Sequence, residues 1–178
     1  MDKRKDIFLT KYTSKKPSRI SKTYNLDKTG KLIKKPGGAM TVGTAELCSF
    51  PDITAVAEAI TELTPSQAFG YGVAKYKKAL VVTKRDFEAT KEKVGSNAVI
   101  TRTREFIRYQ PGPGILMIDI DPAPDKTPLT IDEVREILYK IFPPLRTAPH
   151  LIVPSASTYI YNKDVCLKGP GGIRILVV

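Results

Sequence analysis

The sequence predicts an α/β protein, more closely described as α+β, with a mixed sheet. The main observation is that short apolar, β-branched runs alternate with helical patterns and are separated by turns rich in Gly, Pro and Ser. A second observation is that no internal repeat is visible, which argues against a solenoid. The expected strands are residues 79–83, 98–103, 115–120, 150–154, 158–161 and 173–178.

Helix-capping residues predict where the helices begin and end. Asp52 precedes apolar residues at helical spacing, and Pro65 closes that segment. Thr130 and Glu133 have the spacing of a capping box, which predicts a helix that ends at Pro143. A charged segment over residues 86–94 predicts a further helical turn between two strands.

The net charge of +11 is concentrated near the N-terminus, where the first 36 residues hold 12 basic and 3 acidic side chains. This stretch has no sustained apolar period and ends in Lys-Lys-Pro-Gly-Gly. We therefore expect residues 1–38 to form a flexible basic arm and residues 39–178 to form the folded domain. Such an arm suits nucleic acid, with Lys15, Lys16 and Arg19 among its contacts, although a solubilising tail has the same composition.

Composition also excludes several classes of protein. No run of about 18 uncharged apolar residues is present, and the charged N-terminus is not followed by an apolar signal core, so we expect no membrane span and a cytoplasmic protein. Cys48 and Cys166 lie far apart, and His150 is the single histidine. This spacing favours neither a disulfide nor a structural zinc site.

Asp119 and Asp121 are the strongest candidates for a functional site. They follow a continuous apolar run, which predicts a central strand buried on both faces, and their spacing places both carboxylates on one side of it. Neighbouring carboxylates repel each other, and a bound cation relieves that repulsion. Oxygen ligands suit Mg²⁺ or Mn²⁺, so a metal site for phosphoryl transfer is predicted. The alternative is a pair of solvated aspartates that cap the turn at Pro122.

Three segments together resemble the primase-polymerase domain of plasmid, phage and mobile-element replication proteins, within the archaeo-eukaryotic primase superfamily. They are residues 112–122, the Pro-Ser-Ala-Ser run at 154–157 leading to Tyr159, and residues 169–174. The resemblance covers roughly residues 79–178. It implies a core similar to the RNA-recognition motif, a first motif of Asp-x-Asp for catalytic metal, a second of small-x-His for phosphate, and a third that supplies another carboxylate.

The resemblance assigns roles to individual residues. Asp119 and Asp121 match the first motif, as catalytic residues and metal ligands, and Gly172-Ile173-Arg174 matches the second with Arg174 in place of histidine. Arginine binds phosphate well but cannot transfer protons at neutral pH. The alternative for Arg174 is an ion pair with a neighbouring carboxylate.

No residue matches the third motif, and the sequence ends within an apolar run, so we expect a domain truncated at its C-terminus, and both an active and an inactive fragment stay open. Ser155 and Ser157 share one face of an extended segment and are candidates for nucleotide contacts, alongside Gly172 and Arg174. Turn residues that bond the local backbone are the alternative. Arg102, Arg104 and Arg108 are candidates for tracking a template strand, or else alternate along a solvated strand face.

The expected function is therefore template-directed nucleotidyl transfer in the replication of a plasmid, phage or mobile element. Its partners would be a DNA template, nucleoside triphosphates and, by the resemblance, a replicative helicase domain. Three alternatives stay open: a noncatalytic DNA-binding replication module, a metal-dependent nuclease or phosphohydrolase, and a structural RNA-binding protein.

Overall fold

The computed structural model describes residues 6–95, 98–123 and 125–178, and the chain divides into two compact units, residues 1–114 and residues 115–178. Each unit combines helices with small sheets, which confirms a mixed α+β protein. Among the residues described, no helix has the length and apolar character needed to cross a membrane.

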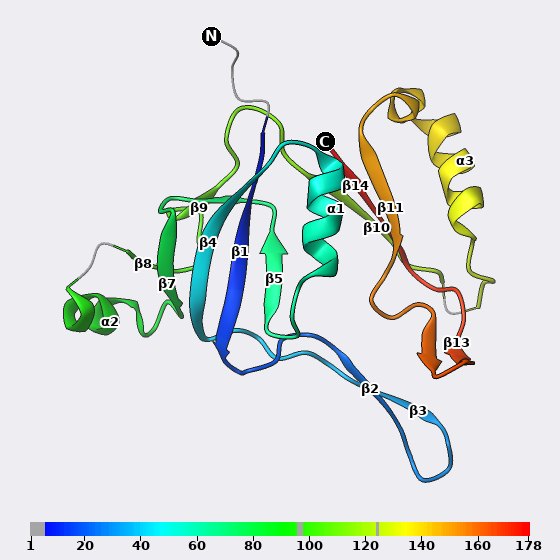
Figure 1. Cartoon of the computed structure of the whole chain (residues 1–178), viewed down its shortest axis with the longest axis horizontal. Helices are drawn as coiled ribbons and strands as arrows, with labels where there is room; N and C mark the ends of the chain where they lie inside the picture. Colours follow the sequence, from blue (N-terminus) through cyan, green and yellow to red (C-terminus); the bar gives the residue numbers. More distant parts are fainter. Residues whose placement is uncertain (1–5, 96–97, 124) are drawn as a thin grey trace. The chain divides into compact units, whose positions relative to one another are not determined.

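The first unit is built on a five-stranded sheet in the order β5-β1-β4-β7-β8 (Figure 1). The pairing of β7 with β8 is parallel and the other pairings are antiparallel, so the sheet is mixed as expected. The strand predicted over residues 98–103 is present only in its first part, because the chain turns away after Ile100. The strands are β1 (Ile7–Lys16), β4 (Val42–Phe50), β5 (Gln67–Gly70), β7 (Lys78–Val82) and β8 (Val99–Ile100).

The prediction of a flexible arm over residues 1–38 is wrong for the residues that the structure describes, and residues 1–5 lie outside them. Strand β1 lies between β4 and β5, and its Ile7 and Leu9 are 1% and 0% exposed. A hairpin of β2 (Thr23–Leu26) and β3 (Leu32–Lys35) follows it. The lysines misled the prediction because a strand can expose alternate charged residues while its apolar residues are buried.

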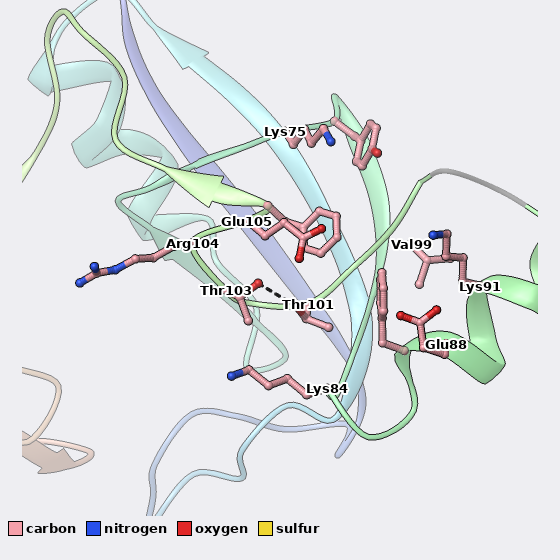
Figure 2. A pocket seen from close by; sticks show the side chains of 12 residues that line it. Lys75, Lys84, Glu88, Lys91, Val99, Thr101, Thr103, Arg104 and Glu105 are labelled. Carbon is pink, nitrogen blue, oxygen red and sulfur yellow. Dashed lines mark hydrogen bonds between the residues drawn. The ribbon is translucent and has the colours of Figure 1, made fainter.

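Two short helices complete the first unit. Helix α1 (Ile53–Thr61) begins as predicted, with the Asp52 carboxylate accepting a 2.9 Å hydrogen bond from the backbone N–H of Ala55, and it packs against β4. Helix α2 (Phe87–Val94) ends at Gly95, whose φ of 60° is the left-handed conformation that favours glycine. An open pocket lies beside α2 (Figure 2), and its lining includes residues just after β6 (Val73–Ala74) and just before β9 (Ile107–Arg108).

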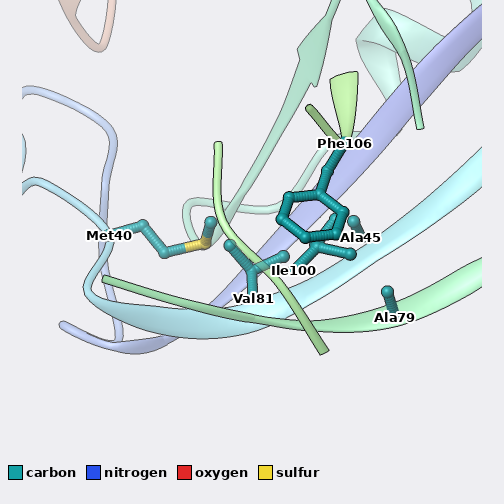
Figure 3. Packing of buried hydrophobic residues seen from close by; sticks show 6 residues of the cluster. All are labelled: Met40, Ala45, Ala79, Val81, Ile100 and Phe106. Atoms are coloured by element: carbon teal, nitrogen blue, oxygen red, sulfur yellow. The ribbon is translucent and has the colours of Figure 1, made fainter. Parts of the chain in front are cut away.

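One hydrophobic cluster of the first unit lies on one face of the sheet. Cross-strand neighbours Ala45, Ala79, Val81 and Ile100 supply its floor, and Phe106 from the loop before β9 packs on them. Figure 3 shows Phe106, Ile100 and Val81 grouped together, with Met40 on one side. Ile100 is fully buried, so truncating it would be expected to cost about 2–5 kcal/mol of folding free energy.

The second unit is a three-stranded antiparallel sheet in the order β10-β14-β11. Its α3 helix has the predicted capping box, in which Thr130 Oγ1 accepts from the backbone of Glu133 and the Glu133 carboxylate accepts from Thr130. A small hairpin and a 3-10 turn, Pro143–Arg146, complete it. The elements are β10 (Leu116–Ile120), α3 (Ile131–Ile141), β11 (His150–Pro154), β12 (Ile160–Asn162), β13 (Val165–Lys168) and β14 (Ile173–Val177).

The position of β10 corrects the prediction of a central strand buried on both faces. Among the described residues β10 pairs only with β14, so it is an edge strand, and its Leu116 is 63% exposed. Strand β14 is the central strand, and its Ile173 and Ile175 pack with Val134 of α3. A continuous apolar run does not distinguish an edge strand from a central one, because the partner strand is distant in sequence.

Candidate metal and nucleotide site

The register of the second sheet brings the predicted residues together on one face. Asp119 of β10 lies opposite Arg174 of β14, and Val153 of β11 lies opposite Arg174 on the other side. Ile173 and Ile175 flank Arg174 and point to the face covered by α3. Because side chains alternate along a strand, Asp119 and Arg174 lie on the face that α3 does not cover.

Asp119 and Arg174 form an ion pair across the two strands. Nε of Arg174 donates to Oδ1 of Asp119 at 3.1 Å, and the two side chains are 37% and 36% exposed. The alternative interpretation of Arg174, a pair with a neighbouring carboxylate, therefore describes the structure. An exposed pair of this kind contributes only about 0–1 kcal/mol, so exchanging the carboxylate for another anion costs little.

Asp121 lies just beyond the end of β10 and approaches Gly172. A Cβ atom placed on Gly172 would lie 2.5 Å from Oδ1 of Asp121 and 3.0 Å from Oγ of Ser155. The absent side chain of Gly172 therefore leaves room for the Asp121 carboxylate and the Ser155 hydroxyl beside the start of β14. Three predicted residues from three segments meet at this point.

The hydroxyl groups after β11 are engaged locally. Ser155 Oγ lies 3.2 Å from both Ser157 Oγ and Thr158 Oγ1, and Ser155 and Thr158 are buried. The Gly172 carbonyl accepts hydrogen bonds from Thr158 Oγ1 at 3.0 Å and from the Ser155 backbone at 2.8 Å. Residues 155–158 form a turn instead of the extended segment predicted, and the Thr158 hydroxyl and the Ser155 backbone N–H hold the Gly172 carbonyl.

The donor atoms present fit a divalent cation only in one binding mode. In the parts of the chain that the structure describes, no three His, Cys, Asp or Glu side chains gather as a metal-binding cluster. Asp119 and Asp121 are both exposed and supply hard oxygen ligands from one end of β10. Mg²⁺ is commonly held by one or two carboxylates together with water and substrate phosphates, and two aspartates fit that mode.

A pocket of about 550 Å³ borders Asp121 and was not foreseen from the sequence. Ile120, Val134 and Ile173 contribute apolar walls, and Lys126 and Thr127 contribute polar groups from the loop after β10. This volume lies in the range of about 300–1,000 Å³ that holds small ligands. The signal available in the sequence was a lysine and a threonine close behind the Asp-x-Asp pair.

Replacing Gly172 with alanine tests whether this close approach matters. The added Cβ would push the Asp121 carboxylate away, so we expect divalent-metal affinity to fall about tenfold, while the free energy of unfolding falls by only about 1–3 kcal/mol. Gly114 is the matched control, since a Cβ there meets nothing within 4 Å. Equal manganese affinity in Gly172→Ala and Gly114→Ala, measured by titration calorimetry, would contradict this role.

The other predicted residues lie in the first unit. Arg102 and Arg104 are exposed in the loop after β8, not alternating along a strand, and Nη2 of Arg102 donates to the Met40 carbonyl at 3.0 Å. Arg108 is exposed at the end of β9, with Nε donating to the Arg104 carbonyl at 2.9 Å. At least part of the role of Arg102 and Arg108 is therefore to hold local backbone.

Lys15, Lys16 and Arg19 belong to a folded, strongly basic segment, residues 15–35, which we call the basic hairpin. Its tip is fixed by Asp27, whose Oδ1 accepts from the Thr29 side chain at 2.7 Å and from the Lys31 backbone at 2.9 Å. These bonds, the Thr29 hydroxyl first, lower the pKa of Asp27, so the tip holds over the physiological pH range. The basic side chains are all exposed: Lys15, Lys16, Arg19, Lys22, Lys28, Lys31, Lys34 and Lys35.

Comparison with known proteins does not assign the chain to a family. No protein family model matches the chain, and neither the curated proteins nor the solved structures contain a significant match to it.

Proposed function

We propose that this protein is a nucleotidyltransferase of the primase-polymerase type that acts on a DNA template in replication. Asp119 and Asp121 would hold Mg²⁺ or Mn²⁺ and serve as the catalytic carboxylates. When bound, the metal would neutralise phosphate charge and activate the attacking hydroxyl. We also propose that the fold of the catalytic core is similar to the RNA-recognition motif.

The observation that supports the proposal most strongly is the convergence of predicted residues from distant parts of the sequence. Asp119 and Asp121 come from β10, Ser155 follows β11, and Gly172 and Arg174 lie at the start of β14. The contact of Asp119 with Arg174 and the approach of Asp121 to Gly172 both depend on the register between β10 and β14. A surface ion pair accounts for the contact of Asp119 with Arg174, but it does not account for the approach of Asp121 to Gly172.

Each side chain then has a defined task. Arg174 would exchange the Asp119 carboxylate for phosphate oxygens, to which its planar head group can present two parallel N–H donors. The Asp119 oxygen released by this exchange would become available to the cation. Ser155 and Thr158 would keep the Gly172 backbone in place, which leaves the space that the Asp121 carboxylate occupies.

Incorporation of labelled nucleotide on a primed DNA template tests the proposal. Extension of the primer that requires Mn²⁺ or Mg²⁺ is the expected result, with ribonucleotides and deoxyribonucleotides assayed separately. Release of nucleotides from the DNA in place of extension would identify a metal-dependent nuclease. Neither extension nor release, with DNA binding retained, would identify a noncatalytic DNA-binding module.

The noncatalytic module is the second candidate, and a specific observation favours it. The ion pair with Arg174 already neutralises one carboxylate, and only two carboxylates lie at the site among the residues described. On this account Asp119→Asn would leave DNA affinity unchanged, and binding would not depend on metal.

We expect the basic hairpin to contribute DNA affinity on either account. Replacing Lys28 and Lys34 with glutamine should weaken binding to single-stranded DNA, because lysines that bind phosphates release condensed counterions. The slope of log affinity against log salt should fall by about 0.7 for each lysine that no longer binds a phosphate. Lys163→Gln with Lys168→Gln, on the β12–β13 hairpin, is the control of equal charge. Equal salt slopes for the two double variants, measured by fluorescence anisotropy, would exclude the basic hairpin from the interface.

A further inference from the structure

The first unit contains a pocket that none of the roles above uses. It has a volume of about 850 Å³ and lies between α2, the loop after β8 and the segment after β6. Figure 2 shows Lys75, Lys84 and Lys91 on three separate segments around it, with the Thr101–Thr103 hydrogen bond between Lys75 and Lys84 in this view. Because all its lining residues belong to the first unit, the pocket is separate from the aspartate site in sequence and in fold.

The pocket has an excess of positive charge. Lys75, Lys84, Lys91 and Arg104 line it, as do two acids, Glu88 and Glu105. Within residues 6–95, 98–123 and 125–178, no ion pair involves any of these four cations. The four cations outnumber the two acids that line the pocket, which favours an anionic ligand, and phosphate is a common one.

Aromatic rings lie among the cations. Nζ of Lys75 is 5.5 Å from the centroid of the Tyr76 ring and 5.9 Å from that of Phe106, and Nζ of Lys91 is 5.8 Å from the Phe87 ring. Phe106 is buried in the core, whereas Tyr76 and Phe87 are half-buried. Tyr76 and Phe87 can therefore contact a flat ring, while the neighbouring ammonium groups contact phosphate.

The remaining polar groups suit a ligand that also donates hydrogen bonds. Oγ1 of Thr101 and Oγ1 of Thr103 lie 3.0 Å apart, and Glu88 and Glu105 provide carboxylate acceptors. Inorganic phosphate would bind the cations, but it would give these carboxylates no hydrogen-bond donor. A nucleoside carries sugar hydroxyls and, in most bases, exocyclic amines that can donate to them.

From this arrangement we infer that the pocket of the first unit binds a nucleoside phosphate without a metal ion. The ligand is either a free nucleotide or one unit of a single strand, since both present the same phosphate, sugar and base. This inference does not rest on the proposed transfer reaction, because it involves neither Asp119 nor Asp121.

Titration calorimetry of AMP into the full chain with excess EDTA tests the inference. EDTA removes any contribution of metal at the aspartates. We expect Lys75→Gln with Lys84→Gln to weaken AMP binding at least about tenfold, since the variant cannot form two charge-assisted hydrogen bonds to the phosphate. Lys77→Gln with Lys78→Gln is the matched control, because both lysines are exposed on the same unit outside the pocket. Equal AMP affinity in the two double variants would overturn the inference.

Further experiments test whether the base contributes to binding and whether the ligand is a free nucleotide or one unit of a single strand. Ribose 5-phosphate should bind at least about tenfold more weakly than AMP, and Tyr76→Leu should remove most of that difference, because base stacking on an aromatic ring strengthens binding by about that factor. If AMP gives no heat, a short oligoribonucleotide of adenosine is the second probe, because each unit keeps the exocyclic amine and the 2′-hydroxyl. Binding of the oligonucleotide that is abolished by Lys75→Gln with Lys84→Gln would support a single strand as the source. Failure of both probes would overturn the inference.

The outcome is distinguishable from that of the proposed function. Asp119→Asn with Asp121→Asn should leave AMP binding in EDTA unchanged, whatever that variant does to primer extension. A loss of AMP binding in the aspartate variant would assign the binding to the aspartate site and overturn the inference.

Discussion

Replacing Asp119 and Asp121 together with asparagine is expected to reduce metal-dependent nucleotide incorporation by about a thousandfold or more. Asparagine keeps the size of each side chain and removes the negative charge that would hold the cation. Primer extension with labelled nucleotide at a fixed manganese concentration measures the effect. The two aspartates are exposed, and the ion pair of Asp119 with Arg174 is a surface pair, so the free energy of unfolding should change by no more than about 1 kcal/mol.

A matched control separates the loss of metal from the loss of negative charge. Glu58 and Glu62, on and just after α1, are exposed and lie outside both pockets. Their replacement with glutamine changes the net charge by the same amount and should leave extension unchanged. Extension that survives in the aspartate variant, with the same metal dependence, would contradict the assignment of these carboxylates.

The second large effect is expected at Leu9, within the segment that its composition suggested to be a flexible arm. Leu9→Ala should lower the free energy of unfolding by about 2–5 kcal/mol, because the side chain is fully buried in β1. Chemical denaturation followed by circular dichroism measures this change. Leu26→Ala, in β2, is the control, since Leu26 is 39% exposed and its replacement should cost about 0.5 kcal/mol or less. Equal stabilities of the two variants would favour the arm over the strand.

Local signals in the sequence predicted the helices and several strands well. Asp52 and the Thr130–Glu133 capping box begin α1 and α3 at the expected residues, and β11 has the predicted bounds. These features depend on a few neighbouring residues, and capping or turn chemistry suffices to identify them. The short strands β5, β6, β9 and β13 were missed because two to four residues give no clear alternation.

Features that depend on distant partners were not predicted. Lysine-rich composition concealed β1, whose burial comes from pairing with β4 and β5. The edge position of β10 likewise depends on which strands pair with it. The candidate residues were identified from motifs, but the close approach of Gly172 to both Asp121 and Ser155 follows from the pairing of β14 with its neighbours. These strands are far apart in the sequence, so no local pattern reveals how they pair.

The most direct test of the proposed site is titration calorimetry of manganese and a nonhydrolysable nucleoside triphosphate into the full chain and into Asp119→Asn with Asp121→Asn. The account predicts that the triphosphate binds the unaltered chain more tightly with manganese than with EDTA, and that this difference disappears in the variant. An equal difference in both proteins, or no difference in either, would contradict a metal and nucleotide site at these aspartates.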